Sequence, residues 1–182
     1  FIKYFPNFLL NKPLINLKKS FESKDFLKAF MPEPFINNGP NSYDFRTSEL
    51  PAGNGHGTAS GLAKLFGILS TGCKRNNNTL MREDSLYKAT RIYTSGPDTV
   101  LFGVPLNFGY CFMLEGNKKS EINFAPIFYK GTFGHAGIGG SVAFGDIKNQ
   151  IGYSFVCNKQ QKNKNLYKTS NLLTKALYEA IS

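Results

Sequence analysis

One imidazole stands among closely spaced glycines between Phe133 and Asp146, and this segment holds the residue types best suited to chemistry. Glycine leaves the backbone bare, so a ligand can reach its main-chain N–H groups. A bare N–H can hold the oxygen of a reacting carbonyl, and a nearby imidazole can donate or accept a proton. His135 and its glycines therefore predict one side of a carbonyl-binding site. The simpler alternative is a histidine that only caps a strand end.

The residues around this segment predict the strands that hold it in place. Residues 141–144 are apolar and prone to form a strand, 146–150 are typical of a turn, and 151–157 predict a second strand. Together they predict a hairpin with a polar, glycine-rich end. In the second strand, Gly152 and Ser154 share one face and leave it open to close packing by a helix.

Two helices are predicted to pack against these strands. The first spans 58–71, where Thr58 can cap the amino end and Gly72 ends the helix. The second is the closing, C-terminal helix over 171–181. Its spacing predicts a core-facing apolar stripe of Leu172, Leu173, Ala176, Leu177, Ala180 and Ile181.

The other segments carry weaker patterns. The sequence predicts further elements in this order: a helix over 21–30, a long loop over 35–57, a short helix over 84–90, and strands near 100–103, 108–115 and 122–128. Runs of strands closed by helices indicate an α+β fold with an antiparallel sheet.

Several motifs together resemble one family. His135-Ala136-Gly137 is similar to the His-x-Gly form of the third motif of serine β-lactamase-like hydrolases, which include esterase-like and penicillin-binding-protein-like members. Asn54-Gly55-His56-Gly57-Thr58-Ala59 resembles a helix start found in the esterase-like branch. Segments 98–101, 108–110 and 153–158 are similar to those that bracket the His-x-Gly strand. The resemblance covers roughly residues 45–182 in the family's order.

The resemblance implies a β-lactamase/transpeptidase-like fold, here with a partial antiparallel sheet packed by helices. We expect 1–182 to be the C-terminal portion of such a domain, with an irregular segment and a short helix over 1–44 and the family-like core over 45–182. The resemblance also implies the site. Its catalytic residues are His135 and Gly137, and its oxyanion and substrate-binding residues are Ala136, Ile138, Asn54 and His56.

The resemblance also specifies which atom of Ile138 acts and where Asn54 and His56 lie. The backbone N–H of Ile138 corresponds to one oxyanion donor of the family. Asn54 and His56 lie in a turn that either lines the rim of the site or serves only as the entry to a helix.

The family's nucleophile and base come from a Ser-x-x-Lys motif upstream of the His-x-Gly strand. Only Ser85-Leu86-Tyr87-Lys88 matches that pattern, and its local sequence is typical of an ordinary helix capped by Ser85. We therefore expect the complete enzyme to act on a small ester, amide or peptide-like substrate through an acyl-enzyme, and this chain alone to be inactive. The alternative is a non-catalytic scaffold or assembly module with the same fold.

The charge invites a third interpretation. The net charge is +10 and the pI is near 9.5, as in proteins that bind polyanions. Lys and Arg are spread through polar segments rather than gathered in a stripe. We therefore expect no nucleic-acid partner; oligomerisation is left open.

Several other functions are disfavoured by composition. Three widely spaced cysteines predict free thiols and favour a reducing compartment. Two histidines far apart, without a carboxylate cluster, give no metal site. The glycines around His56 lack the spacing of a dinucleotide loop, so no cofactor is expected. The longest apolar run, 100–114, is too short for a membrane span.

Overall fold

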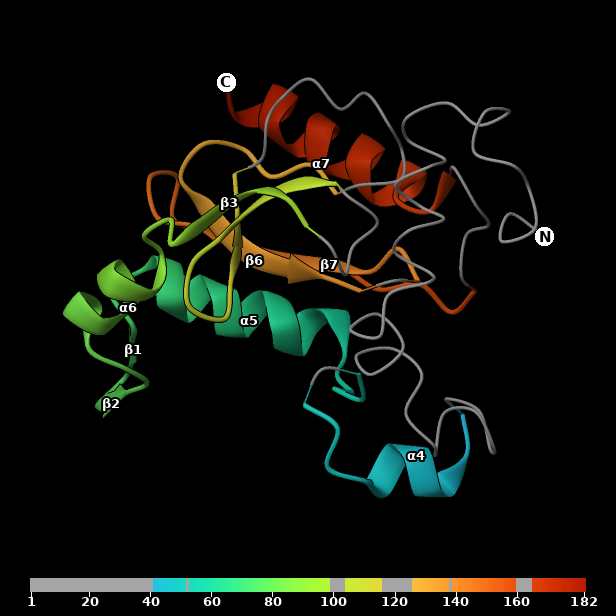
Figure 1. The fold of residues 1–182 in the computed structure, drawn as a ribbon. Coiled ribbons are helices and arrows are strands. Elements are labelled where there is room, and N and C mark those ends of the chain that lie inside the picture. Colours follow the sequence, from blue (N-terminus) through green and yellow to red (C-terminus); the bar gives the residue numbers. More distant parts are fainter. Residues whose placement is uncertain (1–40, 52, 99–103, 116–125, 138, 160–164) are drawn as a thin grey trace. The chain divides into compact units, whose positions relative to one another are not determined.

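The computed structural model describes residues 41–51, 53–98, 104–115, 126–137, 139–159 and 165–182 (Figure 1). The chain divides into two compact units, one of residues 1–56 with 96–105 and one of 57–95 with 106–182. Ile138 and the segments expected to form a helix over 21–30 and a strand near 100–103 lie outside the described residues.

The helices are α4 (Tyr43–Thr47), α5 (Ala59–Ser70), α6 (Glu83–Ala89) and α7 (Lys168–Ile181). The strands are β1 (Lys74–Arg75), β2 (Asn78–Thr79), β3 (Thr94–Pro97), β4 (Pro105–Phe108), β5 (Met113–Leu114), β6 (Thr132–Ala136), β7 (Val142–Asp146) and β8 (Ile151–Phe155).

One sheet organises the structure. Its strand order is β3-β4-β5-β6-β7-β8, and the pairings from β4 to β8 are antiparallel. The predicted hairpin is present as β7 and β8, and β6 lies on the other side of β7 with His135 opposite Ala143. The α+β class with an antiparallel sheet is thereby confirmed.

Helices cover both faces of this sheet, with α5 on one side and α7 on the other (Figure 1). Alternation along β7 explains the division, because successive side chains of a strand point to opposite faces. Phe144 stacks against Tyr178 of α7. A Cβ on the next residue, Gly145, would lie 2.5 Å from Ser70 Oγ of α5.

The contact between α5 and β8 depends on glycines, which have no side chain. A Cβ at Gly152 would lie 2.2 Å from both the Ala63 carbonyl oxygen and the Gly67 nitrogen, so only glycine lets the two backbones approach this closely. The prediction of a helix-packing face at Gly152 is confirmed. The cap of α5 is also as predicted, since the Thr58 side chain accepts from the Gly61 N–H at 3.1 Å.

The core lies between α5 and the sheet. Phe66 and Leu69 of α5 pack with Phe133 of β6, and the Phe66 and Phe133 rings have centroids 5.9 Å apart. Cys73, which is fully buried, and Leu86 of α6 extend the same cluster. Burial of these apolar side chains supplies the main stabilisation of this unit.

Three predicted segments differ from the structure. The long loop over 35–57 contains α4, which begins because the Ser42 side chain accepts from the Phe45 N–H. The strand expected over 108–115 is interrupted where Cys111 adopts φ 64°, so β4 ends at 108 and β5 begins at 113. Of the strand expected near 122–128, the described residues 126–128 form no strand.

The predicted apolar stripe of α7 is wrong. Leu172 is 59 % exposed, and Leu173, Ala176, Ala180 and Ile181 are exposed too, while Leu177 is half-buried. The buried side chains are those of Ser170, Asn171 and Thr174. They face inward because this face of the unit offers polar partners: Asn171 Oδ1 accepts from the Ile127 N–H at 3.0 Å, for example.

Candidate active site

His135 is exposed in a strand whose other residues are buried. Alternation places its side chain on the same face as Phe133, which is 1 % exposed beneath α5. Its Nδ1 lies 2.9 Å from the Ala136 carbonyl oxygen. Because a carbonyl only accepts, Nδ1 carries the proton, and a neutral ring then presents Nε2 as its acceptor. The imidazole is thus oriented and open to solvent.

The strand edge beside His135 has no strand partner among the described residues. The ladder between β5 and β6 joins Met113 to Gly134 and Leu114 to Phe133, and it ends there. It ends because the chain between β4 and β5 turns at Cys111. Phe108, at the start of this turn, has its ring centroid 6.5 Å from that of His135. An extended ligand can pair with such an edge through main-chain hydrogen bonds.

Gly137 opens the turn that joins β6 to β7. Its N–H donates to the Ser141 carbonyl at 2.8 Å, and its own carbonyl accepts from the Gly140 N–H at 2.9 Å. Both groups therefore point toward β7. Gly137 is exposed and Ala136 is buried.

Two side chains from later segments hold this turn. The Tyr167 hydroxyl donates to the Gly137 carbonyl oxygen at 2.9 Å, and Cys157 Sγ donates to the Gly139 carbonyl at 3.2 Å. Tyr167 is 7 % exposed, and this burial raises its pKa to about 12. No local pattern points to Tyr167, because a tyrosine 30 residues from Gly137 carries no spacing signal.

Asn54 and His56 lie in the other compact unit and are described within it. Asn54 Nδ2 donates to the carbonyls of Phe45 and Ser48, which ties it to α4. His56 is exposed, and its Nδ1 lies 2.7 Å from the Asn54 carbonyl. Asn54 thus has a structural role in its own unit.

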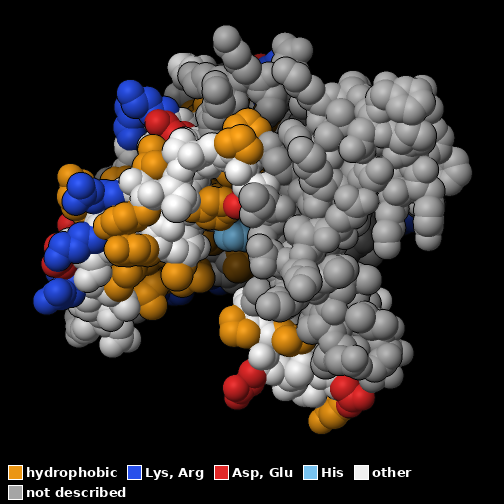
Figure 2. All heavy atoms as spheres, viewed as in Figure 1, with side chains coloured by type: hydrophobic (Ala, Val, Ile, Leu, Met, Phe, Trp, Pro, Cys, Tyr) orange, Lys and Arg blue, Asp and Glu red, His pale blue; other side chains and the backbone are white. Residues whose placement is uncertain are grey.

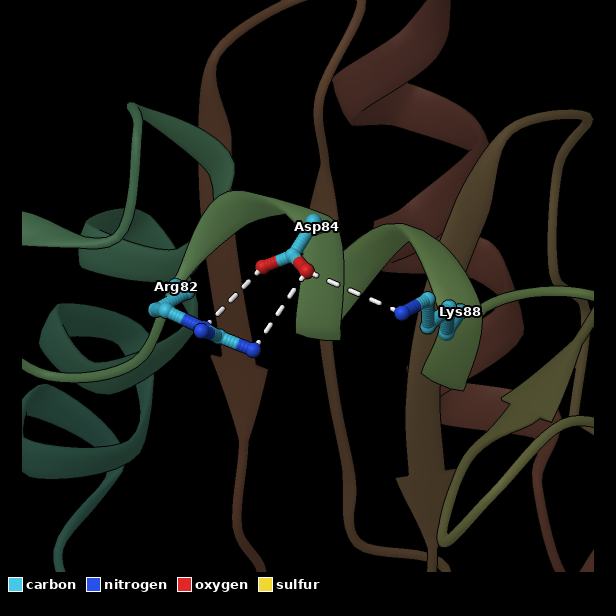
Figure 3. Close-up of polar contacts among 3 residues, drawn as sticks. All are labelled: Arg82, Asp84 and Lys88. Atoms are coloured by element: carbon cyan, nitrogen blue, oxygen red, sulfur yellow. Dashed lines mark hydrogen bonds and ion pairs between the residues drawn. The ribbon is translucent and has the colours of Figure 1, made fainter.

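The Ser85-x-x-Lys88 match lies on α6, where Lys88 turns to Asp84 rather than to Ser85. Asp84 lies between Arg82, at 3.3 Å, and Lys88, at 3.7 Å (Figure 3). All three side chains are more than half exposed, so these ion pairs contribute little to stability. The expectation that Ser85 caps the helix is wrong, because α6 begins two residues earlier, after Arg82.

Surface charges, thiols and metal-binding groups can be located among the described residues. On the face shown in Figure 2, Lys and Arg side chains lie apart, with hydrophobic, acidic and other side chains between them. Cys73, Cys111 and Cys157 are all free thiols. Within the described ranges, no group of three His, Cys, Asp or Glu side chains is arranged to hold a metal ion. No helix in these ranges has the length and apolar character needed to cross a bilayer.

The fold resembles solved structures of three proteins. A penicillin-binding protein homolog from Caulobacter crescentus aligns with 85 % of this chain at a TM-score of 0.67 and 28 % identity. A family VIII carboxylesterase aligns with 70 % at 0.57 and 27 % identity. EstA from Arthrobacter nitroguajacolicus Rue61a aligns with 76 % at 0.57, and its 22 % identity supports the fold alone. The alignments cover 39 %, 35 % and 37 % of those chains.

Sequence comparison gives the same result. The curated protein "Esterase/beta-lactamase LipL" of Mycobacterium tuberculosis (strain ATCC 25618 / H37Rv) is 31 % identical over 115 residues, or 62 % of this chain. The chain spans about a quarter of that protein's length, 24 %. The model of the family described as Beta-lactamase matches residues 20–176. The chain therefore belongs to the beta-lactamase family, whose members are β-lactamase-like serine hydrolases.

Proposed function

We propose that this chain is the C-terminal part of a serine esterase or amidase that works through an acyl-enzyme. It supplies the His135 wall and the oxyanion side of the site, while Ser-x-x-Lys comes from sequence that precedes residue 1 in a longer polypeptide. The observation that carries the proposal is the open edge of β6, where an exposed imidazole stands beside a glycine turn. The names of the relatives, an esterase/beta-lactamase and a carboxylesterase, favour an ester substrate.

The geometry of the described residues suits acyl transfer in two respects, and the resemblance adds a third assignment. The edge beyond Gly134 lets an extended substrate pair with the strand. His135 offers Nε2 for a hydrogen bond to the substrate or for proton transfer to the leaving group. The N–H of Ile138 is assigned as one oxyanion donor, and the second comes from the nucleophile's own backbone. Asn54 and His56 are assigned to the rim.

Hydrolysis of nitrophenyl esters tests the proposal. We expect no turnover by residues 1–182 alone and measurable turnover by a longer polypeptide that carries the upstream Ser-x-x-Lys segment. His135→Ala should lower kcat of that polypeptide by about 10²-fold or more, as for loss of a general acid or base. Ser85→Ala is the matched control and should change nothing. If residues 1–182 alone hydrolysed the ester in a way that needs His135 but not Ser85, the assignment of the nucleophile to upstream sequence would be wrong. If the longer polypeptide were inactive, the result would favour a non-catalytic scaffold.

Gly137→Val tests the oxyanion side. A Cβ at this position meets only Ser141 atoms, at 3.8 and 3.9 Å, so the fold accepts a side chain there. The bulk at the open edge should block the substrate carbonyl and reduce turnover by about 10²-fold or more. The measurement is kcat/KM with thermal unfolding of the same sample.

The control for Gly137→Val is Gly134→Ala, whose Cβ would lie 2.1 Å from the Ala143 carbonyl oxygen. It should destabilise the fold itself. Unchanged turnover in Gly137→Val would remove residue 137 from the site.

A further inference from the structure

We propose that the stacked rings of Tyr93 and Tyr110 form a platform that binds an aromatic ring of the substrate beside His135. This inference rests on the proposed function and names the substrate class, an ester that carries an aromatic ring on a short spacer. The two rings are nearly parallel, with centroids 4.0 Å apart and an interplanar angle of 13°. Both tyrosines and His135 belong to the compact unit of residues 57–95 and 106–182.

Exposure distinguishes this pair of rings from the other stacked rings. Tyr93 is 46 % exposed and Tyr110 is 59 % exposed. The other stacked pairs among the described residues consist of buried or half-buried rings. Contiguous aromatic surface that stays exposed is typical of a binding site, and a flat ligand ring can stack on it.

Phe108 connects this platform to His135. The Phe108 ring has its centroid 6.5 Å from that of His135. Its carbonyl accepts from the Tyr93 N–H at 2.9 Å. Tyr110 follows Phe108 by two residues, so the Cα atoms of the two residues lie within about 8 Å of each other. A substrate held at His135 can therefore reach the platform through a short spacer.

The platform is ordered before any ligand binds. The Tyr110 N–H donates to the Ala89 carbonyl at 2.9 Å, and a Cβ at Gly109 would lie 2.1 Å from the same carbonyl oxygen. The turn therefore lies directly against the end of α6. A hydrogen bond between the Tyr93 and Tyr110 side chains raises the pKa of Tyr110 and ties the rings together at their hydroxyl ends. Because both rings are already fixed, stacking of a ligand costs little conformational entropy.

Matched esters test the platform in the longer polypeptide that carries Ser-x-x-Lys. Ethyl 3-phenylpropanoate and ethyl 3-cyclohexylpropanoate place the ring in the acyl half of the ester. The acetates of 2-phenylethanol and 2-cyclohexylethanol place it in the alcohol half. Titration of the released acid at constant pH gives kcat/KM for each ester. We expect the aromatic member of at least one pair to be preferred about 5-fold, which corresponds to the gain from ring stacking beyond burial of apolar area.

Substitutions at Tyr110 test whether the platform causes this preference. Tyr110→Leu keeps an apolar side chain but removes the ring, so the preference should disappear. Tyr110→Phe removes only the hydroxyl and should retain it. The matched control is Tyr87→Leu, at a tyrosine that is 70 % exposed and has no stacked ring among the described residues. Equal kcat/KM for both members of both pairs in an active parent, or a preference that survives Tyr110→Leu, would overturn the inference.

A second measurement detects binding without turnover. In residues 1–182 with ¹³C-labelled tyrosine rings, the ring current of stacked 3-phenylpropan-1-ol should shift the NMR signals of Tyr93 and Tyr110, which are assigned by their loss in Tyr93→Leu and Tyr110→Leu. The non-aromatic 3-cyclohexylpropan-1-ol should not produce these shifts. Unmoved signals with the aromatic alcohol would overturn the inference. An inactive longer polypeptide would instead overturn the proposed function, and the tyrosine signals would still test the platform.

Discussion

At the scale of single residues, exposure separates the groups that can react from those that only pack. His135 is exposed although Phe133, two residues earlier on the same face, is buried under α5. The imidazole thus reaches solvent from within a regular strand. A histidine in this position is fixed by its backbone and free at its ring, which suits it to meet a substrate.

The three cysteine thiols also differ in exposure, and this difference predicts the order in which they react. Cys111 is exposed, and Cys73 is fully buried. Cys157 is half-buried, and its thiol donates a hydrogen bond to the Gly139 carbonyl oxygen. Burial, with a smaller contribution from Glu83, raises the pKa of Cys73, and the thiolate is the reactive form. Labelling with a maleimide should therefore modify Cys111 first, Cys157 next and Cys73 last.

Peptide mass spectrometry over a time course measures that order. In denaturant all three cysteines should react at similar rates, which provides the control. Early labelling of Cys73 in the folded protein would contradict the packing of the core described above.

At the scale of elements, the contact between α5 and β8 is the one most sensitive to substitution. Gly152→Ala would place a methyl group 2.2 Å from backbone atoms of the helix, which cannot move aside as a side chain can. We expect a loss of about 1–3 kcal/mol in the free energy of unfolding. Urea denaturation followed by circular dichroism measures it.

Gly57→Ala is the matched control for Gly152→Ala. Its Cβ would meet only Leu62 at 3.7 Å, an ordinary contact, so the free energy of unfolding should change little. If Gly152→Ala were equally harmless, the close approach of α5 to β8 would be wrong.

The closing helix α7 shows where a periodic pattern misleads. Its apolar residues repeat at helical spacing, but the inward side is occupied by Asn171, Thr174 and Tyr178, which meet polar groups and aromatic rings. The pattern therefore identified the helix correctly and its buried face wrongly. Hydrophobic spacing gives the period of an element, and its orientation depends on the chemistry of the surface it contacts.

At the scale of the whole molecule, a buried carboxylate joins α7 to the sheet and makes a pH-dependent contribution to stability. Asp146 is 1 % exposed and accepts from the Tyr178 hydroxyl at 2.6 Å and from Asn149. Burial raises the pKa of Asp146, but its hydrogen bonds outweigh that effect and hold the pKa below its ordinary value. Burial and then Asp146 raise the pKa of Tyr178.

The direction of the pH effect follows from these shifts. The unfolded chain takes up a proton at Asp146 near pH ~4, before the folded protein does, so stability falls as the pH drops below that value. At the alkaline end, unfolded Tyr178 ionises near pH ~10 while the folded hydroxyl does not, so stability falls above it. Between the two limits the interaction contributes fully.

Tyr178→Phe tests this link between α7 and the sheet. Removing a hydrogen bond to a buried charge should cost about 1.5–3 kcal/mol at neutral pH. The pKa of Asp146 should rise, so the loss of stability in acid should begin at a higher pH than in the parent. Denaturation midpoints from pH 3 to pH 7, ~1 pH unit apart, measure both effects. If the denaturation midpoints of the variant and the parent fell with decreasing pH over the same range, the Tyr178 hydroxyl would have no influence on the pKa of Asp146.

The sequence by itself determined the family, the α+β class, helix α5 with its Thr58 cap, and the hairpin of β7 and β8. These features depend on residues near one another in the chain, where caps, turns and strand alternation act. Only the tertiary structure decided which face of α7 is buried, where the β5–β6 ladder ends, and that Tyr167 reaches Gly137. Each of these depends on contacts between distant segments, and local residue patterns carry no record of such contacts.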